Sequence, residues 1–180
     1  MEGSARRGLV IVYTGNGKGK TTAALGMAVR AVGHGMRVVM IQFIKGSWHY
    51  GEIDGALRLR PEFELITAGR GFVGIMDDDL PREVHIAAAR EALKVSREAL
   101  LSNMYDIVIL DEVNYAIKLG LISVEDVLDL IKVKPYSTTL MLTGNYSDER
   151  IIDEADLVTE MREIKHPFKK GIKALKGVDF

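Results

Sequence analysis

Apolar residues in this chain gather in short runs that are separated by glycine-rich or polar stretches. The run at residues 9–13 is rich in β-branched side chains and leads directly into glycines, which is typical of a strand buried on both faces of a sheet. Similar runs predict further strands at residues 37–43, 63–67, 105–110, 138–142 and 157–161. The pattern therefore predicts a sheet of short, largely apolar strands.

Helical segments are predicted between these strands. Residues 21–32 are rich in alanine, leucine and methionine, and a Gly-His-Gly turn closes this helix. Residues 82–101 form the most regular helix, because its apolar positions fall mostly on one face: Ile86, Ala89, Leu93 and Leu100. Ser123 followed by Asp126 predicts a capping box that opens a third helix, which runs through residue 131.

Strands that alternate with helices predict an α/β fold, in which a parallel sheet is covered by helices on both faces. Residues 44–60 and 68–81 are expected to be loops, the first because of its glycines and the second because of its acidic residues. No internal repeat, low-complexity tract or linker divides the sequence, so residues 1–180 are expected to form a single domain.

The composition narrows the range of functions. Of 180 residues, 47% are hydrophobic and 27% are charged, which excludes general disorder. The 24 Lys and Arg residues nearly balance 25 Asp and Glu residues, so the overall charge predicts no binding to nucleic acid or to an anionic membrane. The absence of cysteine excludes disulfides, thiolate nucleophiles and Cys-ligated metal centres. No apolar run approaches the ~20 residues of a membrane helix, so a cytoplasmic protein is expected.

The first candidate site is the glycine loop, which we define as residues 14–22 with the sequence Thr-Gly-Asn-Gly-Lys-Gly-Lys-Thr-Thr. A strand that feeds into glycines, then Gly-Lys-Thr and a helix, binds triphosphates because backbone N–H groups and the helix N-terminus face the phosphates. Lys20 would reach phosphate oxygens, and the Thr21 hydroxyl would help to hold Mg²⁺. The general motif has glycine at position 14, where this chain has Thr14. The predicted nucleotide-binding residues are Gly15, Asn16, Gly17, Lys18, Gly19, Lys20, Thr21 and Thr22.

Two carboxylates form the other half of the predicted site. Asp111 and Glu112 follow the predicted strand at residues 105–110, and ligands of α/β sheets bind at the carboxyl ends of strands. Both are candidate Mg²⁺ ligands beside Thr21, although the pair taken alone could simply begin the next loop. With the glycine loop, they indicate a P-loop NTPase of the RecA-like type, a three-layer fold with a mostly parallel central sheet, that binds Mg²⁺ and a nucleoside triphosphate.

From about residue 8 onward the chain resembles the ATP:corrinoid adenosyltransferases of the CobA/BtuR type. The glycine loop is similar to the family's own, including the threonine in place of the motif's first glycine. Further matching segments lie, in the family's order, at residues 31–35, 42–46, 110–112, 143–144 and 165–179. The resemblance implies that Co(I) of a reduced corrinoid attacks C5′ of ATP and releases triphosphate, in the synthesis or salvage of adenosylcobalamin. It also implies a homodimer and a flavoprotein or other reductase that supplies Co(I).

The resemblance implies roles for residues of the predicted site as well. Lys20 and the backbone amides of residues 15–22 would hold the triphosphate, while Thr21 and Glu112 would hold Mg²⁺ with Asp111 nearby. Such a reaction needs no general base, because Co(I) is a strong nucleophile with no proton to lose. The protein would therefore act mainly by positioning C5′ and by stabilising the leaving group.

Three positions depart from the family pattern. Phe72 corresponds to a family phenylalanine that contacts the lower face of the corrin and helps to expel its lower ligand, but Gly74 stands where well-known members have a second aromatic residue. Residues 1–8 are too short for the N-terminal helix that closes over the corrinoid in some members. Asn145 stands where members commonly have arginine. Lower-ligand displacement and one phosphate contact are therefore expected to differ here.

Two other functions are compatible with the glycine loop. A P-loop ATPase or small-molecule kinase would release phosphate or a phosphorylated product, and it needs a water-orienting residue that the sequence does not identify. A non-catalytic module would bind ATP or corrinoid without turnover, and Gly74 favours this alternative. The aromatic group Trp48, His49 and Tyr50 either lines a nucleoside or corrin pocket or packs its loop on itself.

Overall fold

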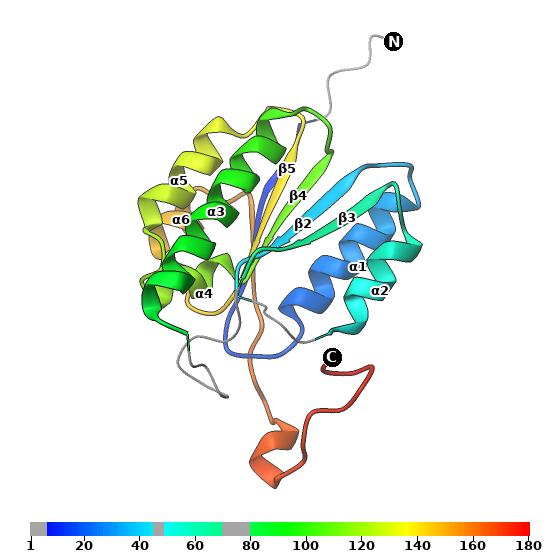
Figure 1. The fold of residues 1–180 in the computed structure, drawn as a ribbon, viewed down its shortest axis with the longest axis vertical. Coiled ribbons are helices and arrows are strands. Elements are labelled where there is room, and N and C mark those ends of the chain that lie inside the picture. Colours follow the sequence, from blue (N-terminus) through cyan, green and yellow to red (C-terminus); the bar gives the residue numbers. More distant parts are fainter. Residues whose placement is uncertain (1–6, 45–48, 70–79) are drawn as a thin grey trace.

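The structure is a computed structural model that describes residues 7–44, 49–69 and 80–180. Within these residues, six parallel strands form one sheet with the order β3-β2-β4-β5-β1-β6 (Figure 1). The strands are β1 (Val10–Thr14), β2 (Val38–Gln42), β3 (Phe63–Thr67), β4 (Ile107–Asp111), β5 (Thr139–Thr143) and β6 (Leu157–Glu160). All the strands predicted from the sequence are confirmed, and β4, which ends in Asp111, lies in the middle of the sheet.

Helices cover both faces of this sheet. One face carries α1 (Lys20–Val32) and α2 (Gly51–Arg58), and the other carries α3 (Arg82–Leu101), α4 (Val113–Lys118), α5 (Val124–Val133) and α6 (Glu149–Asp153) (Figure 1). This three-layer arrangement confirms the predicted α/β fold class. None of the helices formed by the described residues has the length and apolarity that crossing a lipid bilayer requires.

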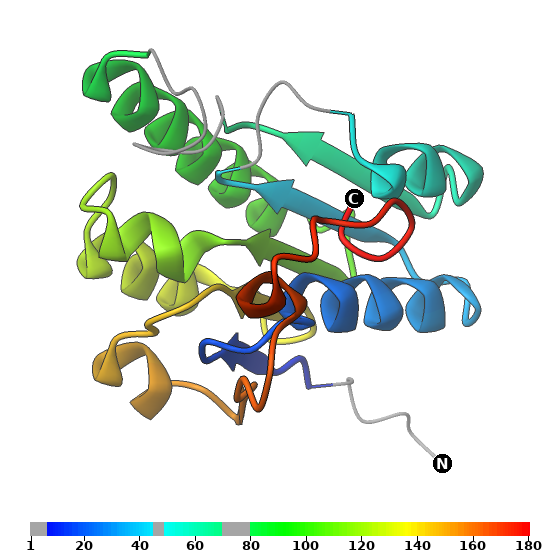
Figure 2. The same ribbon diagram turned by 90° about the horizontal axis from the view of Figure 1, so that it is seen from below.

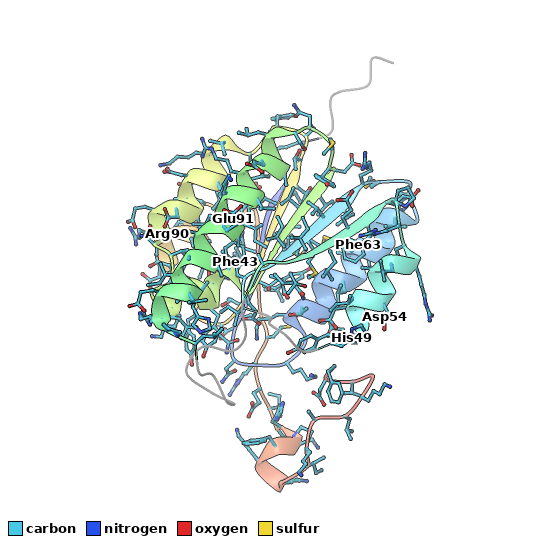
Figure 3. All side chains as sticks on the ribbon, viewed as in Figure 1. Phe43, His49, Asp54, Phe63, Arg90 and Glu91 are labelled. Carbon is cyan, nitrogen blue, oxygen red and sulfur yellow. The ribbon has the colours of Figure 1, made fainter. Side chains whose placement is uncertain are left out.

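The core consists of two apolar layers because the strands are buried on both faces. Successive residues of a strand point to opposite faces, so Leu110 joins the layer under α3 and α5 while Ile109 joins the layer under α1. Phe43 lies in the same layer as Leu110, and Phe63 lies in the same layer as Ile109 (Figure 3). Continuous apolar strands are the sequence signature of such a doubly covered sheet.

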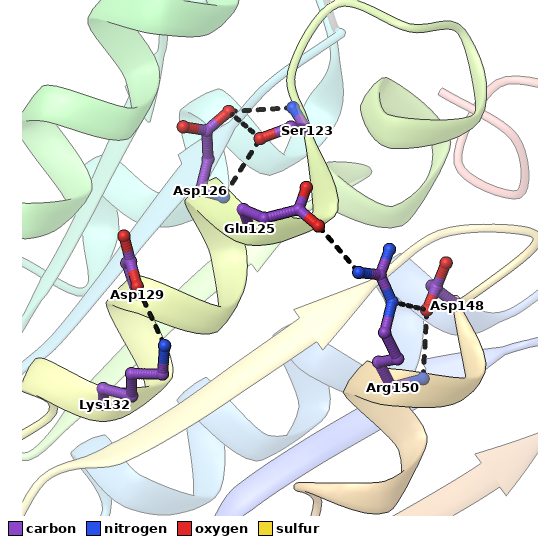
Figure 4. Close-up of polar contacts among 7 residues, drawn as sticks. All are labelled: Ser123, Glu125, Asp126, Asp129, Lys132, Asp148 and Arg150. Atoms are coloured by element: carbon purple, nitrogen blue, oxygen red, sulfur yellow. Dashed lines mark hydrogen bonds and ion pairs between the residues drawn. The ribbon is translucent and has the colours of Figure 1, made fainter.

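The capping box predicted before α5 is present. The Ser123 hydroxyl accepts the N–H of Asp126 at 3.2 Å, and the Asp126 carboxylate accepts the N–H of Ser123 at 2.8 Å (Figure 4). Nearby, Arg150 donates to Glu125 at 2.7 Å and to Asp148 at 3.1 Å, which links the start of α6 to the start of α5. The ends of these helices are thus fixed by side chains close to them in sequence or across one loop.

The expectation of a loop over residues 44–60 is wrong, because α2 occupies residues 51–58. Two glycines, Gly51 and Gly55, weaken its helix propensity, but Ala56 is buried against the sheet and packing overrides that propensity. The short helices α4 and α6 were not predicted either, since neither spans enough turns to show a periodicity. Of the predicted loop 68–81, residues 70–79 lie outside the described residues.

After β6 the chain continues as the C-terminal segment, which we define as residues 161–180. It contains one 3₁₀ turn, η1 (Pro167–Lys170). Figure 2 shows the segment, in orange and red, passing in front of the ends of the strands and finishing beside α1 and α2. The end of the chain therefore returns to the edge of the sheet at which the glycine loop lies.

Candidate nucleotide site

The glycine loop joins β1 to α1 and closes around its own lysine. Gly15 and Gly19 have φ values of 93° and 114°, a left-handed conformation that side chains disfavour, so glycine is required at both. The Lys20 ammonium is buried and donates to the carbonyl oxygens of Gly15 at 2.8 Å and Gly17 at 2.7 Å. These two hydrogen bonds close the loop into a compact turn around the lysine.

Asp111 is fully buried at the end of β4 and receives hydrogen bonds from three other elements. Its Oδ1 accepts from the hydroxyls of Thr21 at 2.9 Å and Thr143 at 2.7 Å, and its Oδ2 accepts from the Gln42 amide at 3.3 Å. These bonds fix the Thr21 hydroxyl, in the first turn of α1, to the middle of the sheet. The sequence prediction that Asp111 and Thr21 lie together is confirmed.

Gln42 and Thr143 are site residues to which sequence reasoning assigned no role. Both end a buried parallel strand at the same edge of the sheet as Asp111, and that shared position is the signal that identifies them. The Thr143 hydroxyl also accepts the backbone N–H of Glu112 at 3.0 Å. Glu112 has a φ of 62°, so this bond helps to hold a strained residue next to the glycine loop.

A cavity of about 570 Å³ opens at this edge of the sheet. It is lined by Lys18, Gly19, Lys20, Thr21, Thr22, Leu25, Tyr50, Gly51, Glu52, Glu112, Gly177, Val178, Asp179 and Phe180. The second half of the glycine loop, residues 18–22, and Glu112 therefore share one space, as the sequence predicted. Asp111 and residues 15–17, although described, do not line it.

The first half of the glycine loop contacts protein instead. The N–H of Gly17 donates to the Met161 carbonyl at 2.6 Å, and the Asn16 amide oxygen accepts the N–H of Glu163 at 3.1 Å. A methyl group on Gly17 would lie 2.7 Å from the Met161 oxygen, so glycine is needed for the C-terminal segment to cross the loop. That residues 15–17 bind phosphate stays a prediction, and in this arrangement Asn16 and Gly17 contact the C-terminal segment.

Thr14 replaces the first glycine of the general motif because its position is ordinary strand backbone. It is the last residue of β1, and its hydroxyl accepts the N–H of Ser147 at 3.1 Å. The side chain thus joins the start of the glycine loop to the loop after β5. A glycine would lose this hydrogen bond without gaining any conformation that the chain needs here.

The charges around the cavity bear on Lys20. Burial lowers the pKa of Lys20, and the negative charges of Glu112 and Asp111 partly oppose that effect. The described residues contain no cluster of three or more His, Cys, Asp or Glu side chains that would hold a metal by themselves. The hydroxyl of Thr21 and the carboxylate of Glu112 line the cavity, and such oxygen atoms could hold Mg²⁺ if phosphate oxygens and waters completed its shell.

The aromatic group of the sequence analysis is divided in the structure. Tyr50 is buried and lines the cavity, whereas His49 is exposed and lies 2.8 Å from Asp54 (Figure 3). Trp48, and Phe72 with Gly74, lie outside the described residues. Of the aromatic candidates that the structure describes, Tyr50 is thus the one that shares a cavity with the glycine loop.

Comparison with known proteins agrees with this geometry. The sequence profile of the family described as ATP:corrinoid adenosyltransferase BtuR/CobO/CobP matches residues 6–180. A corrinoid adenosyltransferase of Escherichia coli (strain K12) is 40% identical over 97% of this chain and 86% of its own length, and one of Pseudomonas aeruginosa is 42% identical over 97% and 84%. The flagellar accessory protein FlaH of Methanocaldococcus jannaschii shares the fold, with a TM-score of 0.57 over 88% of this chain and 73% of its own at 13% identity.

Proposed function

Because the chain belongs to the ATP:corrinoid adenosyltransferase family BtuR/CobO/CobP, we propose that the cavity at its glycine loop is the site of adenosyl transfer. The protein is a corrinoid adenosyltransferase, which transfers the 5′-deoxyadenosyl group of ATP to the Co(I) of a reduced corrinoid. The electron pair of Co(I) forms the new bond to C5′ while the C5′–O bond breaks, and triphosphate leaves with the bonding electrons. The observation that carries the proposal is that Lys20, Thr21 and Glu112 line one cavity.

Triphosphate is held, in this proposal, by Lys20 and the backbone N–H groups of residues 18–22 at the start of α1. The positive end of the α1 dipole and the ammonium both favour the negative charge that grows on the leaving group. Lys20 already lies in the cavity wall, where two loop carbonyls hold its ammonium. When phosphate binds, the ammonium exchanges at least one of these carbonyls for a phosphate oxygen, a stronger charge-assisted bond.

Residues 15–17 of the predicted nucleotide-binding set have contacts that differ from those of residues 18–22. Gly15, Asn16 and Gly17 shape the turn and hold Met161 and Glu163 of the C-terminal segment, so they support the phosphate-binding half of the loop. We propose that their contribution to ATP binding is indirect in this arrangement. Lys18, Gly19 and Thr22, which line the cavity with Lys20 and Thr21, would contact the nucleotide directly.

Mg²⁺ would be held by the Thr21 hydroxyl and the Glu112 carboxylate, with phosphate oxygens and water as the remaining ligands. Bound there, Mg²⁺ would neutralise charge on the triphosphate. We propose that Asp111 acts through Thr21 and does not bind Mg²⁺ directly, because both its oxygens already accept hydrogen bonds and it is fully buried. Its role is to orient the Thr21 hydroxyl, so that an oxygen lone pair faces the cavity.

Our proposals for how the corrinoid binds and is reduced are based on membership of the family. We propose that Phe72 contacts the lower face of the corrin, and that a flavoprotein or other reductase supplies Co(I) in the cytoplasm. A homodimer is proposed as the working assembly. It is supported by β6, an edge strand whose Leu157 and Val158 remain 40% and 39% exposed, because a second copy would cover such an apolar edge.

The decisive experiment is an anaerobic assay with chemically reduced Co(I) corrinoid and Mg-ATP. We expect a light-sensitive adenosylated corrinoid and one equivalent of triphosphate. The Lys20→Ala variant should lose about 10²–10³-fold in rate, because it removes one preorganised cation from the leaving group. Lys132→Ala, which removes an exposed lysine that pairs with Asp129 on α5, should keep full activity. Formation of ADP and phosphate instead of triphosphate would contradict the proposal.

A further inference from the structure

We propose that the turn at residues 177–180 is the wall of the cavity that holds the nucleoside end of ATP. In this proposal Phe180 stacks on the base, and Asp179 is a positioning residue that fixes the turn through Lys18. The inference rests on the proposed function, because the triphosphate must lie at residues 18–22 for the nucleoside to reach this turn. It adds a second element to the nucleotide site, taken from the opposite end of the chain.

The cavity has two chemically different sides, and they match the two parts of a nucleoside triphosphate. The glycine loop presents lysines, hydroxyls and backbone N–H groups, which suit phosphates. The side that meets the C-terminal segment presents four large apolar side chains, Leu25, Tyr50, Val178 and Phe180, beside the carboxylates of Glu52 and Asp179. A purine base is a flat aromatic surface that gains most from stacking on such side chains.

The turn at residues 177–180 has a defined shape. The carbonyl of Leu175 accepts the N–H groups of Val178 at 3.1 Å and Asp179 at 2.8 Å, and the N–H of Gly177 donates to Phe180 at 2.8 Å. Gly177 has a φ of 79°, which glycine adopts without strain. The Asp179 carboxylate also accepts the N–H of Leu175 at 2.8 Å. Hydrogen bonds within residues 175–180 therefore fix the shape of the turn.

Asp179 connects this turn to the glycine loop. Its Oδ1 forms an ion pair with the Lys18 ammonium, while its Oδ2 holds the turn. The N–H of Leu175 and the nearby Lys18 both lower the pKa of Asp179, so the carboxylate is ionised at neutral pH. One side chain thus sets both the shape of the turn and its distance from the loop.

The exposure of the turn's apolar residues also points to a ligand. Val178 is 62% exposed and Phe180 is 40% exposed, although both line the cavity. A methyl group on Gly51 would lie 4.0 Å from the Phe180 carbonyl carbon, so the turn already rests against the start of α2 (Figure 2). Apolar side chains at a cavity wall that the fold itself leaves uncovered are typical of ligand contacts.

The test separates the two ends of ATP by comparing ATP with inorganic triphosphate, which has no nucleoside. In Phe180→Ala, the KM for ATP should rise about tenfold, because one stacking contact is lost, while the inhibition constant of triphosphate stays unchanged. The kcat should also stay unchanged, since the contact is made equally in the ground and transition states. Phe168→Ala is the matched control, because Phe168 is 78% exposed in η1 of the same segment and does not line the cavity.

Asp179 is tested in the same assay. We expect Asp179→Asn to raise the KM for ATP severalfold, and Asp179→Glu to restore most of the affinity because it keeps the charge that pairs with Lys18. If Phe180→Ala changes neither constant, or raises the triphosphate inhibition constant as much as the KM for ATP, the turn is not a nucleoside wall. Lys20→Ala should weaken triphosphate inhibition; if it does not, the proposed function's phosphate site is wrong, whatever Phe180 does.

Discussion

The sheet behind the nucleotide cavity and the C-terminal segment that lines part of it are held in place by different interactions. Every residue of β2, β4 and β5 is buried, and Asp111 at the end of β4 is fully enclosed. In the C-terminal segment, all of which the structure describes, no residue is buried. Backbone hydrogen bonds to the glycine loop and the ion pair of Lys18 with Asp179 attach that segment, and the ion pair of Glu163 with Lys169 lies within it.

This difference separates the rigid part of the site from the adjustable part. Burial of apolar surface stabilises the sheet strongly, whereas an exposed ion pair contributes only about 0–1 kcal/mol. The C-terminal segment is therefore expected to open with a much smaller free energy than the sheet needs to unfold. In the proposed arrangement, the phosphate-binding groups would stay fixed while the C-terminal segment opens for nucleotide exchange.

The largest expected effect comes from the sheet. Leu110 is fully buried on β4 between Ile41 and Leu142 of the neighbouring strands, so Leu110→Ala should lower the free energy of unfolding by about 2–5 kcal/mol. Leu175→Ala, which truncates a leucine that is 54% exposed in the C-terminal segment, should change it by no more than about 0.5 kcal/mol. Urea denaturation of both variants measures these two changes in the free energy of unfolding. Equal losses would mean that the sheet and the C-terminal segment do not differ in this respect.

The contact between the two regions can be broken at Gly17. A Cβ at this position would lie 2.7 Å from the Met161 oxygen and 2.8 Å from the Arg162 carbonyl carbon, so Gly17→Ala should displace the C-terminal segment. We expect faster trypsin cleavage at the segment's lysines and about tenfold weaker ATP binding, the equivalent of one lost anchoring contact.

The control for this variant is Gly26→Ala in α1, where nothing lies within 4 Å of the added methyl group. It should leave trypsin cleavage unchanged and stabilise the protein by about 0.5–1 kcal/mol, because alanine is the better helix former. An unchanged cleavage rate in Gly17→Ala would mean that the segment is not held by the glycine loop.

Alkaline pH should distinguish the buried Lys20 from an exposed lysine. Burial lowers the pKa of Lys20, so its ammonium loses its proton at a lower pH than that of an exposed lysine. Below the pKa of Lys20, the affinity for triphosphate should not change with pH on account of this lysine. Above that pKa, the affinity should fall by up to about tenfold per pH unit. In Lys20→Arg the decline should move beyond the measurable range, because a guanidinium stays protonated. A decline that persists in Lys20→Arg would assign the effect to another group.

The smallest effect concerns a helix end far from the cavity. Ser123→Ala removes the hydroxyl that accepts the N–H of Asp126, so it should cost about 1 kcal/mol of stability, whereas Ser123→Gly should cost only a few tenths. Adenosyl transfer should be unchanged in both, because neither Ser123 nor Asp126 lines the cavity. Thermal unfolding and the cobalt assay measure the two properties separately, and a loss of activity without unfolding would show that α5 is coupled to the site.

Prediction from the sequence succeeded where the signal is local. The six strands and the α3 and α5 helices follow from apolar periodicity and from one capping box, and the glycine loop follows from its own residues. It failed for α2, whose two glycines conceal a helix that depends on burial of Ala56. It also failed to give Gln42 and Thr143 a role, since each is an isolated polar residue at the end of a strand.

The sequence by itself determined the fold class, the family and the position of the glycine loop with Lys20, because each depends on contiguous residues. Tertiary structure alone decided which distant groups meet: Gln42 and Thr143 at Asp111, Met161 over Gly17, and Asp179 at Lys18. Such meetings depend on the order of strands in the sheet and on the path of the C-terminal segment across it. A hydrophobic pattern records which face of a strand is buried but carries no information about its neighbours, so only the folded chain could show that both ends of the sequence build one site.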